Sequence, residues 1–413
     1  MPSTRSVLLG IGLLTAGCGL VRAGANPEAP LWMHRPSGAL DIVYKRPLVA
    51  PARAETEAYQ RGRPEIDPAH RRVFVGSSDQ GLYALRAEDG RVIWRFETLG
   101  FVQCEPLYDA SENVVYFGSN DGALYKVGAD DGRLIWRFST NAEVSARPVL
   151  DGGRLYVVNA NDTVIALEPK SGKLLWSQHR TPAMGMEVAG YSGPLVFRGR
   201  VYAGFSDGVV MAYDAVTGQE RWQPVDLTAE AEQTLGELPT YFDVDTTPIG
   251  DVIDAGPVVY VGSYAGGVFA LDAATGVQVW SNPAVAGVSD LALWQQPAHP
   301  PRDGIGPDIP ARKLLIAGTG TTGLWALDPE TGREVWRKPL PVGGVSAPVP
   351  IAGALMVSTT MLGVFLLSPI DGSIIDGVHT GEGTAMTPAT HGTRAFVVTN
   401  GGDFMGIHVA PPI

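Results

Sequence analysis

The sequence predicts an all-β fold, an eight-bladed β-propeller whose blades are four-stranded sheets. Three observations lead to this prediction. A unit of about 40 residues recurs along the chain, a proline recurs at a fixed phase within it, and a tryptophan recurs ten residues after an alanine. Units of this length that contain several short strands bury their apolar faces only against their neighbours, as in a propeller or a similar array.

The clearest copy of the repeat is Arg72 to Thr98, RVFVGSSDQGLYALRAEDGRVIWRFET. Its apolar runs are separated by polar turns at Ser78 to Gly81 and at Glu88 to Gly90, which predicts a meander of three strands. Five further copies and a degenerate seventh, which begins GALMVSTTMLG, follow it along the chain.

A fourth strand is expected ahead of each meander, marked by a proline. The prolines lie 28 to 32 residues before the tryptophans, or before Asp376 in the degenerate copy. Proline cannot donate to a strand ladder and is confined to sheet edges and strand starts, so this strand should be the innermost one, which lines the central channel. These prolines are Pro64, Pro106, Pro148, Pro194, Pro248 and Pro348.

The outer half of each repeat carries the tryptophan. A glycine lies four residues before it and suits a hairpin turn with a positive φ. Tryptophan offers a large apolar area and an N–H that requires an acceptor, which favours a wedge between adjacent sheets. The predicted structural tryptophans are Trp94, Trp136, Trp176, Trp222, Trp280 and Trp336.

The pattern A-x-D-x-x-T-G-x-x-x-W, clearest from Ala270 to Trp280 and from Ala326 to Trp336, resembles the tryptophan-docking repeat of quinoprotein (PQQ-type) propellers. In that family the motif is structural. The resemblance therefore implies the fold and leaves the activity open.

The two ends of the chain are expected to close the ring together. Residues 383 to 410 supply a strand after Pro388 and two more, which leaves one strand missing. Near the N-terminus, Val43 to Leu48 match Val335 to Leu340, with tyrosine in place of tryptophan. This early strand should complete the last sheet and give eight blades with no half-made sheet.

Length and charge limit the possible functions. The 413 residues carry a formal charge of −12 and are 45% hydrophobic, which fits one large domain from residue 40 to 413. No basic cluster is available to neutralise successive phosphates, so nucleic-acid binding is not expected.

The first residues are predicted to be a lipoprotein signal peptide, residues 1–17. A positive Arg5 precedes an apolar core from Val7 to Leu14, and Thr15-Ala16-Gly17-Cys18 resembles a bacterial lipobox. Lipidation of Cys18, followed by a tether to residue 39, would anchor the protein to a membrane. The resemblance to bacterial sorting signals, with glycine after the cysteine, implies the periplasmic face of the outer membrane. An ordinary secretory signal cut nearby is the alternative.

The sequence gives no signature of a metal site or a cofactor. Cys104 is then the one remaining cysteine and is expected to be a buried small hydrophobe. The seven histidines are scattered without ligand spacing. The stretch Gly318 to Gly323 fits G-x-G-x-x-G but lies between two predicted strands, so it is interpreted as a turn.

Three segments depart from the repeat, namely Thr181 to Gly193, Leu227 to Asp245 and the Pro-rich Gln296 to Arg312. Loops on a rigid scaffold commonly carry function, although the Pro-rich one is expected to be only an exposed loop. The second insertion leads into Asp243-Val244-Asp245-Thr246-Thr247-Pro248, where an inner strand should start.

This DVDTTP string resembles the corresponding loop of the BamB family, the lipoprotein propellers of the outer-membrane β-barrel assembly machinery. The resemblance covers the whole mature chain. It implies that Asp243 and Asp245 belong to a surface that docks on periplasmic POTRA domains of the BamA subunit. A second interface loop would fall on Met186, Val188 and Ala189, with alanine where the family pattern has arginine.

Physically, two carboxylates one residue apart can cap turns, chelate a cation, or pair with a partner's Lys or Arg. The function predicted is a scaffold without catalytic activity, with the BamA-like subunit, its assembly complex and nascent outer-membrane proteins as partners and with no cofactor. The alternatives are a scaffold or sensor of another envelope complex and a PQQ-dependent dehydrogenase. Resemblance to the latter would imply adjacent cysteines, which this sequence lacks.

Overall fold

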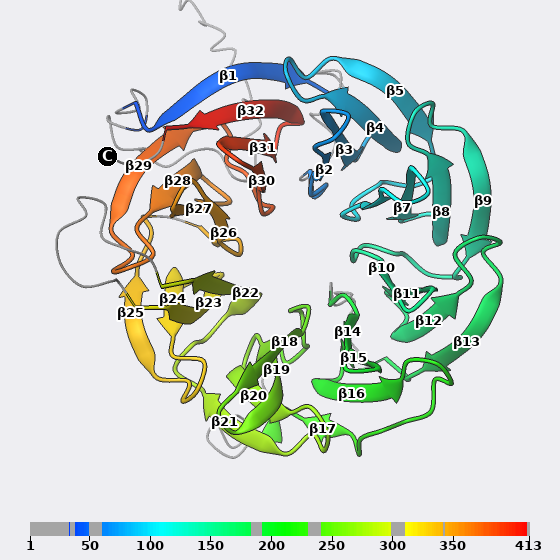
Figure 1. The fold of residues 1–413 in the computed structure, drawn as a ribbon, viewed down its shortest axis with the longest axis vertical. Helices are drawn as coiled ribbons and strands as arrows, with labels where there is room; N and C mark the ends of the chain where they lie inside the picture. Colours follow the sequence, from blue (N-terminus) through cyan, green and yellow to red (C-terminus); the bar gives the residue numbers. More distant parts are fainter. Residues whose placement is uncertain are drawn as a thin grey trace, which may run out of the picture.

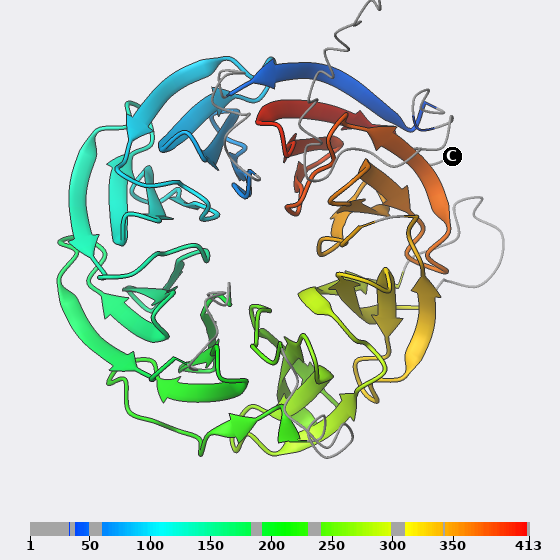
Figure 2. The same cartoon turned by 180° about the vertical axis from the view of Figure 1, so that it is seen from behind.

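Eight four-stranded antiparallel sheets are arranged around one axis, which confirms the predicted propeller (Figure 1). The computed structural model describes residues 33, 38–48, 60–182, 192–229, 241–298, 310–341 and 343–410. Seen from behind, the same ring of sheets surrounds the axis (Figure 2). None of the described residues forms a helix long and apolar enough to cross a membrane.

The first four blades follow one another along the chain, each running from an innermost to an outermost strand. Their strands are β2 (Glu65–Asp67), β3 (Arg72–Ser77), β4 (Gly81–Arg86) and β5 (Val92–Glu97) in blade 1; β6 (Leu107–Asp109), β7 (Val114–Ser119), β8 (Ala123–Gly128) and β9 (Leu134–Ser139) in blade 2; β10 (Val149–Asp151), β11 (Arg154–Asn159), β12 (Thr163–Leu167) and β13 (Leu174–His179) in blade 3; and β14 (Leu195–Phe197), β15 (Arg200–Gly204), β16 (Val209–Asp214) and β17 (Val225–Asp226) in blade 4.

The remaining blades repeat this order, and the last one contains strands from both ends of the chain. Their strands are β18 (Ile249–Ile253), β19 (Gly256–Ser263), β20 (Gly267–Asp272) and β21 (Gln278–Asn282) in blade 5; β22 (Val288–Gln296), β23 (Arg312–Thr319), β24 (Leu324–Leu327) and β25 (Glu334–Lys338) in blade 6; β26 (Val349–Ile351), β27 (Ala354–Ser358), β28 (Gly363–Leu367) and β29 (Ile374–His379) in blade 7; and β30 (Ala389–His391), β31 (Arg394–Val398), β32 (Asp403–Val409) and β1 (Leu40–Pro47) in blade 8.

The recurring prolines mark the innermost strands, as predicted. Each one immediately precedes the first residue of its strand, from Pro64 before β2 to Pro388 before β30. At this position the missing N–H costs no ladder hydrogen bond. Blade 6 has no such proline, and its inner strand β22 is the longest of the eight, with nine residues.

The ring is closed by β1, which pairs with β32 as the sequence predicted (Figure 1). Tyr44 lies opposite Gly406 and takes the place of the tryptophan, and its hydroxyl donates to the Ala87 carbonyl of blade 1 at 3.0 Å. Lys45 forms an ion pair with Asp403 at 2.9 Å. The strands that come first and last in the chain thus share one sheet.

Within the described residues, five of the six predicted structural tryptophans donate their N–H to a carbonyl of the next blade, and Trp222 is the exception. Trp280 on β21 donates from Nε1 to the Pro329 carbonyl of blade 6 at 3.0 Å. Its ring lies on Gly332, where an added Cβ would be 2.3 Å from Trp280 Cε3. Gly332 has a φ of +68°, so the glycine both makes the turn and receives the ring of the preceding blade.

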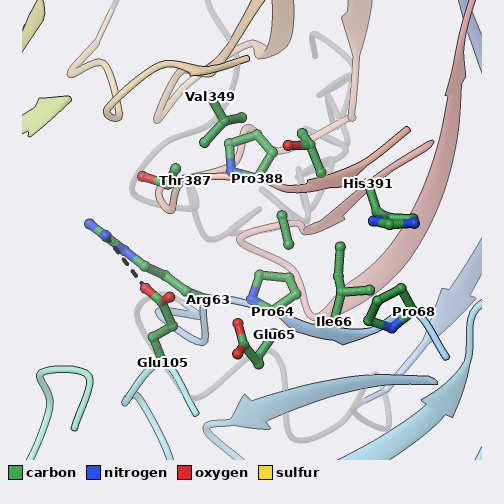
Figure 3. A pocket seen from close by; sticks show the side chains of 12 residues that line it. Arg63, Pro64, Glu65, Ile66, Pro68, Glu105, Val349, Thr387, Pro388 and His391 are labelled. Carbon is green, nitrogen blue, oxygen red and sulfur yellow. Dashed lines mark ion pairs between the residues drawn. The ribbon is translucent and has the colours of Figure 1, made fainter. Parts of the chain in front are cut away.

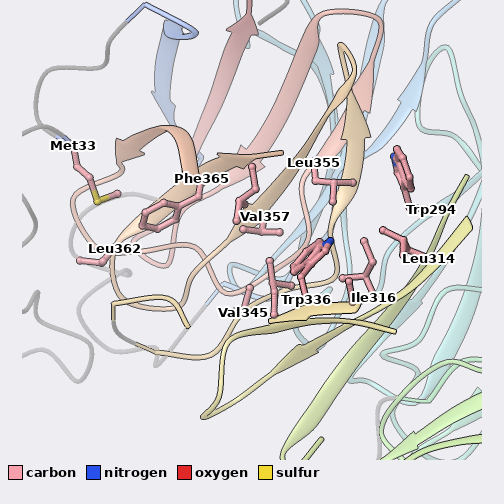
Figure 4. Packing of buried hydrophobic residues seen from close by; sticks show 13 residues of the cluster. Met33, Trp294, Leu314, Ile316, Trp336, Val345, Leu355, Val357, Leu362 and Phe365 are labelled. Carbon is pink, nitrogen blue, oxygen red and sulfur yellow. The ribbon is translucent and has the colours of Figure 1, made fainter. Parts of the chain in front are cut away.

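The apolar core lies between adjacent blades and not within any one of them. Between blades 6 and 7, Trp336 and Ile316 pack with Leu355, Val357 and Phe365 (Figure 4). Equivalent clusters occur between other neighbouring pairs, including blades 8 and 1. Burial between neighbours supplies the cohesion that a single four-stranded sheet lacks.

The propeller has two distinct faces. The insertion face carries the turns between second and third strands and the connections between blades, which are joined by bonds such as Thr98 N to the Gln80 carbonyl. The opposite face carries the other two turns of each blade, joined by bonds such as Ala87 N to the Arg71 carbonyl. Residues 181–193 and 227–245 connect blades, whereas residues 296–312 lie within the β22–β23 hairpin. The described ends of the Pro-rich segment therefore lie at the opposite face, and its residues 299–309 lie outside the described residues.

Candidate functional site

The DVDTTP segment runs directly into β18, where the sequence placed it. It forms hydrogen bonds with β19 and with residues 192–193 ahead of β14. Thr246 Oγ1 donates to the Gly262 carbonyl at 3.1 Å and accepts from Gly262 N at 2.7 Å. The Ser192 hydroxyl donates to the Thr246 carbonyl at 3.0 Å, and Thr247 Oγ1 accepts from Gly193 N at 2.9 Å. The two threonines hold the connection from blade 4 to blade 5 in place.

The two aspartates of this segment have different surroundings. Asp243 is buried, with 3% of its surface exposed, and its carbonyl accepts from Tyr264 N at 3.4 Å. Asp245 is half-buried and lines the central channel. The part of the chain described by the structure contains no group of three or more His, Cys, Asp or Glu side chains that could hold a metal ion. The other predicted interface residues, Met186, Val188 and Ala189, and the predicted lipidation site Cys18 lie outside the described residues.

The central channel contains a cavity of about 520 Å³. Its charged lining consists of three arginines and three carboxylates, so the formal charges balance. These residues are Arg61, Arg63, Arg147, Glu105, Asp245 and Asp290.

Ion pairs connect this lining across the axis. Arg63 Nη2 lies 2.7 Å from Asp290 Oδ2, which joins blade 1 to blade 6, and Arg63 Nη1 lies 3.8 Å from Glu105 Oε2. Arg147, ahead of β10, lies 2.9 Å from Glu65 of β2 through Nη2 and 3.0 Å from Glu105 through Nε. We call Arg63, Arg147, Glu65, Glu105 and Asp290 the channel network.

Glu105 is the carboxylate of the channel network whose charged form is disfavoured by burial. Burial raises the pKa of its carboxyl, and the neighbouring Arg63 and Arg147 only partly offset this effect. Next to it, Cys104 is fully buried and its thiol lies 3.0 Å from the Ala146 carbonyl, as expected for a small hydrophobe. Burial raises the pKa of the Cys104 thiol to about 12.

A second cavity of about 330 Å³ adjoins the network between blades 1, 7 and 8. One wall is formed by Pro64 and Ile66 near β2, facing Val349 and Pro388 on the other side (Figure 3). Arg63 and Glu105 line both cavities, so the network lies between the two.

Sequence reasoning missed the channel network, although the proline phase contains the signal for it. In a strand-like segment, alternate residues point the same way. Residues one and three places before the prolines therefore face the axis together, and most of the charged lining occupies these positions. In blades 1, 2, 3 and 5 these pairs are Arg61 and Arg63, Gln103 and Glu105, Ser145 and Arg147, and Asp245 and Thr247.

Comparison with known proteins identifies relatives of the same architecture. The chain is 25% identical over 227 residues to the outer membrane protein assembly factor BamB of Legionella pneumophila, an alignment that covers 55% of this chain and about half, 52%, of that relative. The crystal structure of BamB from Moraxella catarrhalis matches with a TM-score of 0.66 at 18% identity, covering 89% of this chain and 99% of that one.

A quinohemoprotein alcohol dehydrogenase, ADH-IIG of Pseudomonas putida, has a similar fold. Its structure matches with a TM-score of 0.64 at 15% identity and covers 94% of this chain and 79% of that one. At such identities both structural matches show a shared fold and do not indicate a shared function. The family model described as outer membrane protein assembly factor BamB matches residues 109–293 and 289–409, which is more than half of the sequence. The chain belongs to this BamB family.

Proposed function

We propose that this protein is a non-catalytic scaffold for the assembly of β-barrel proteins in the outer membrane. Its membership of the BamB family carries the proposal. In this role the propeller is a lipid-anchored periplasmic protein, with residues 1–17 removed, Cys18 acylated and residues 40–413 folded as one domain. Its partner is the POTRA-bearing subunit of the assembly machinery.

The arrangement of the loops supports docking through the insertion face. The segments 181–193 and 227–245 both connect blades, so their described ends lie at this face, and the DVDTTP segment begins at the end of the second of them. Asp245 stands at the channel, where a partner that covers the insertion face would reach it. The sheets beneath hold the described ends of these segments at a fixed geometry, which lowers the entropy lost on binding.

The two aspartates differ in burial, so we expect them to have different roles. Asp243 supports the loop from inside, since its side chain is almost inaccessible, whereas Asp245 keeps accessible surface. Replacing Asp243 with alanine should therefore reduce loop order and stability. Replacing Asp245 should weaken pairing with a basic partner by about 1.5 to 3 kcal/mol, the usual range for a hydrogen bond to a charged group.

Co-purification tests the proposal. The tagged wild-type protein, extracted in detergent, should bring down a barrel-assembly complex, and the double variant Asp243→Ala/Asp245→Ala should bring down less of it. Asp254→Ala is the matched control, because Asp254 is an exposed aspartate in the β18–β19 turn of the opposite face. Equal thermal stability of Asp245→Ala and wild type would separate loss of docking from loss of fold.

Two results would contradict this function. One is recovery of a different envelope complex that still depends on Asp245. The other is dye-linked alcohol oxidation by the purified protein after loading with PQQ, which would move the chain to the class of its dehydrogenase relatives.

A further inference from the structure

The guanidiniums of the channel network have hydrogen-bond donors to spare. A guanidinium carries five N–H donors. Within the described residues, Arg63 donates one hydrogen bond, to Asp290, and Arg147 donates one, to Glu65. Arg147 Nε is buried and has no aligned partner, although Glu105 lies 3.0 Å away. Both arginines keep about a third of their side-chain surface accessible, 33% and 36%, and both line the channel cavity.

The carboxylates that hold these arginines are already well supplied. Asp290 Oδ2 accepts from Arg63, from the Thr387 hydroxyl at 3.1 Å and from Ala347 N at 3.4 Å, and Oδ1 accepts from Leu291 N at 3.1 Å. Glu65 Oε1 accepts from Arg147 Nη2 at 2.9 Å and from Tyr108 N at 3.4 Å. Glu65 and Asp290 therefore already accept hydrogen bonds from other groups and leave most of the N–H donors of Arg63 and Arg147 unused.

Glu105 is the exception among the acidic groups. It lies between the two arginines, at 3.0 Å from one and 3.8 Å from the other, and neither contact is an aligned hydrogen bond. It occupies the place where an anion would collect the spare donors of both guanidiniums. A carboxylate held by proximity alone is the member of the network that a better-fitting anion can displace.

We propose that the central channel is a binding site for a small molecule that carries a compact oxyanion, a carboxylate or a phosphate, which Arg63 and Arg147 hold in competition with Glu105. The cavity of about 520 Å³ is the size of an ordinary small-molecule site. The remainder of such a ligand lies against Ser145, and against Gly320 and Gly344, which leave that side of the cavity open.

Competition with Glu105 gives the site a pH dependence. Burial raises the pKa of Glu105, so this carboxyl takes up a proton at a higher pH than an exposed glutamate does. Arg63, Arg147, Glu65 and Asp290 are the charged groups that face it. Once Glu105 is neutral, the balanced lining carries a net positive charge and its competitor is gone. Anion binding should therefore tighten as the pH falls through the pKa of Glu105.

Calorimetric titration of the purified mature protein with sodium sulfate, at constant ionic strength maintained with chloride, tests this site. Sulfate does not titrate in the range used, and malonate in a parallel series shows whether the site prefers a carboxylate. Wild type should bind more tightly at about pH 5 than at about pH 7.5, a range above the reference pKa of glutamate. Glu105→Gln should bind about tenfold more tightly at the higher pH and lose the pH dependence.

Two variants that each replace an arginine with an uncharged side chain, together with a control, complete the test. Arg63→Gln and Arg147→Gln should each weaken binding about tenfold or more, because each removes charge-assisted donors. Arg137→Gln, an arginine on outer strand β9 that contacts the Tyr125 hydroxyl, should bind as wild type does. If Arg147→Gln fails to fold, the double variant Arg147→Gln/Glu105→Gln replaces it. Binding that Glu105→Gln leaves unchanged, or no binding in wild type and Glu105→Gln alike, would overturn the proposal. The measurement uses the isolated chain, so its outcome is independent of the assembly partner.

Discussion

At the scale of single residues, the tryptophans show how one side chain joins two blades. Each ring lies on the turn glycine of the next repeat, and in all but one case the N–H donates to a backbone carbonyl there. Trp94, for example, donates to the Ala129 carbonyl at 2.9 Å and lies against Gly132. Trp222 is different. It is buried, with 3% of its surface exposed, yet its Nε1 has no acceptor among the described residues.

This difference predicts unequal costs for the same substitution. Trp280→Phe keeps most of the ring packing but loses the hydrogen bond to Pro329, so the free energy of unfolding should fall by about 1 kcal/mol beyond the packing loss. Trp222→Phe removes a buried donor that has no partner, so its cost should be smaller. Denaturant titration followed by circular dichroism compares the two variants. Equal losses in both would show that the indole N–H contributes nothing at either site.

At the scale of strands, local sequence was a sufficient guide to the blades and a poor one to the channel. Turn residues, the proline phase and the alanine-to-tryptophan spacing all act within one repeat, so the strands of the blades could be predicted, except that blade 6 lacks the proline that marks an inner strand. The channel network could not be predicted in this way, because Arg63 and Asp290 are 227 residues apart and meet only after the ring closes. The burial of Asp243 was also unpredictable, since it depends on how the connection from blade 4 packs on blade 5.

The closing strand β1 offers a prediction at this scale. Tyr44 fastens β1 to blade 1 through Ala87 and packs at 6.0 Å, ring to ring, from Phe404 of β32. Tyr44→Ala should speed amide hydrogen exchange in β1 and β32, because both contacts are lost and this sheet opens first. Exchange in β11 and β12 of blade 3, on another part of the ring, should stay unchanged. Uniform acceleration throughout the protein would instead show that the ring opens only as a whole.

At the scale of the whole molecule, buried ion pairs near the turns supplement the apolar contacts between blades. Arg72 of β3 lies 2.7 Å from Asp67 and also donates to the Ala129 carbonyl of blade 2 at 2.7 Å. Burial alone would raise the pKa of Asp67, but the hydrogen bonds from Arg72 and His70 outweigh it and hold the pKa below its usual range. An interior pair of this kind fixes geometry and is costly to break.

Measuring the free energy of unfolding as a function of pH tests the contribution of the Asp67–Arg72 ion pair. The pKa of Asp67 is lower in the folded state than in the unfolded chain, so the stability it contributes is present above about pH 4 and is lost as the pH falls further. Asp67→Asn should lower the free energy of unfolding at neutral pH by about 2 kcal/mol, because Arg72 loses its buried carboxylate and keeps only its ion pair with the exposed Asp130. Its stability should then fall less steeply in acid. Asp254→Asn, which changes an exposed turn, should follow the wild-type curve.

The pairing of β1 with β32 also has a consequence for biogenesis. Leu40 is the register partner of Val409, so β1, the strand synthesised first, cannot pair until β32, the strand synthesised last, is present. Seven blades can assemble in order as the polypeptide emerges, whereas the eighth has to bring together segments separated by nearly the entire chain, a slow, entropically costly step. A chain that ends before β32 therefore lacks the pairing partner of β1 and cannot close the ring.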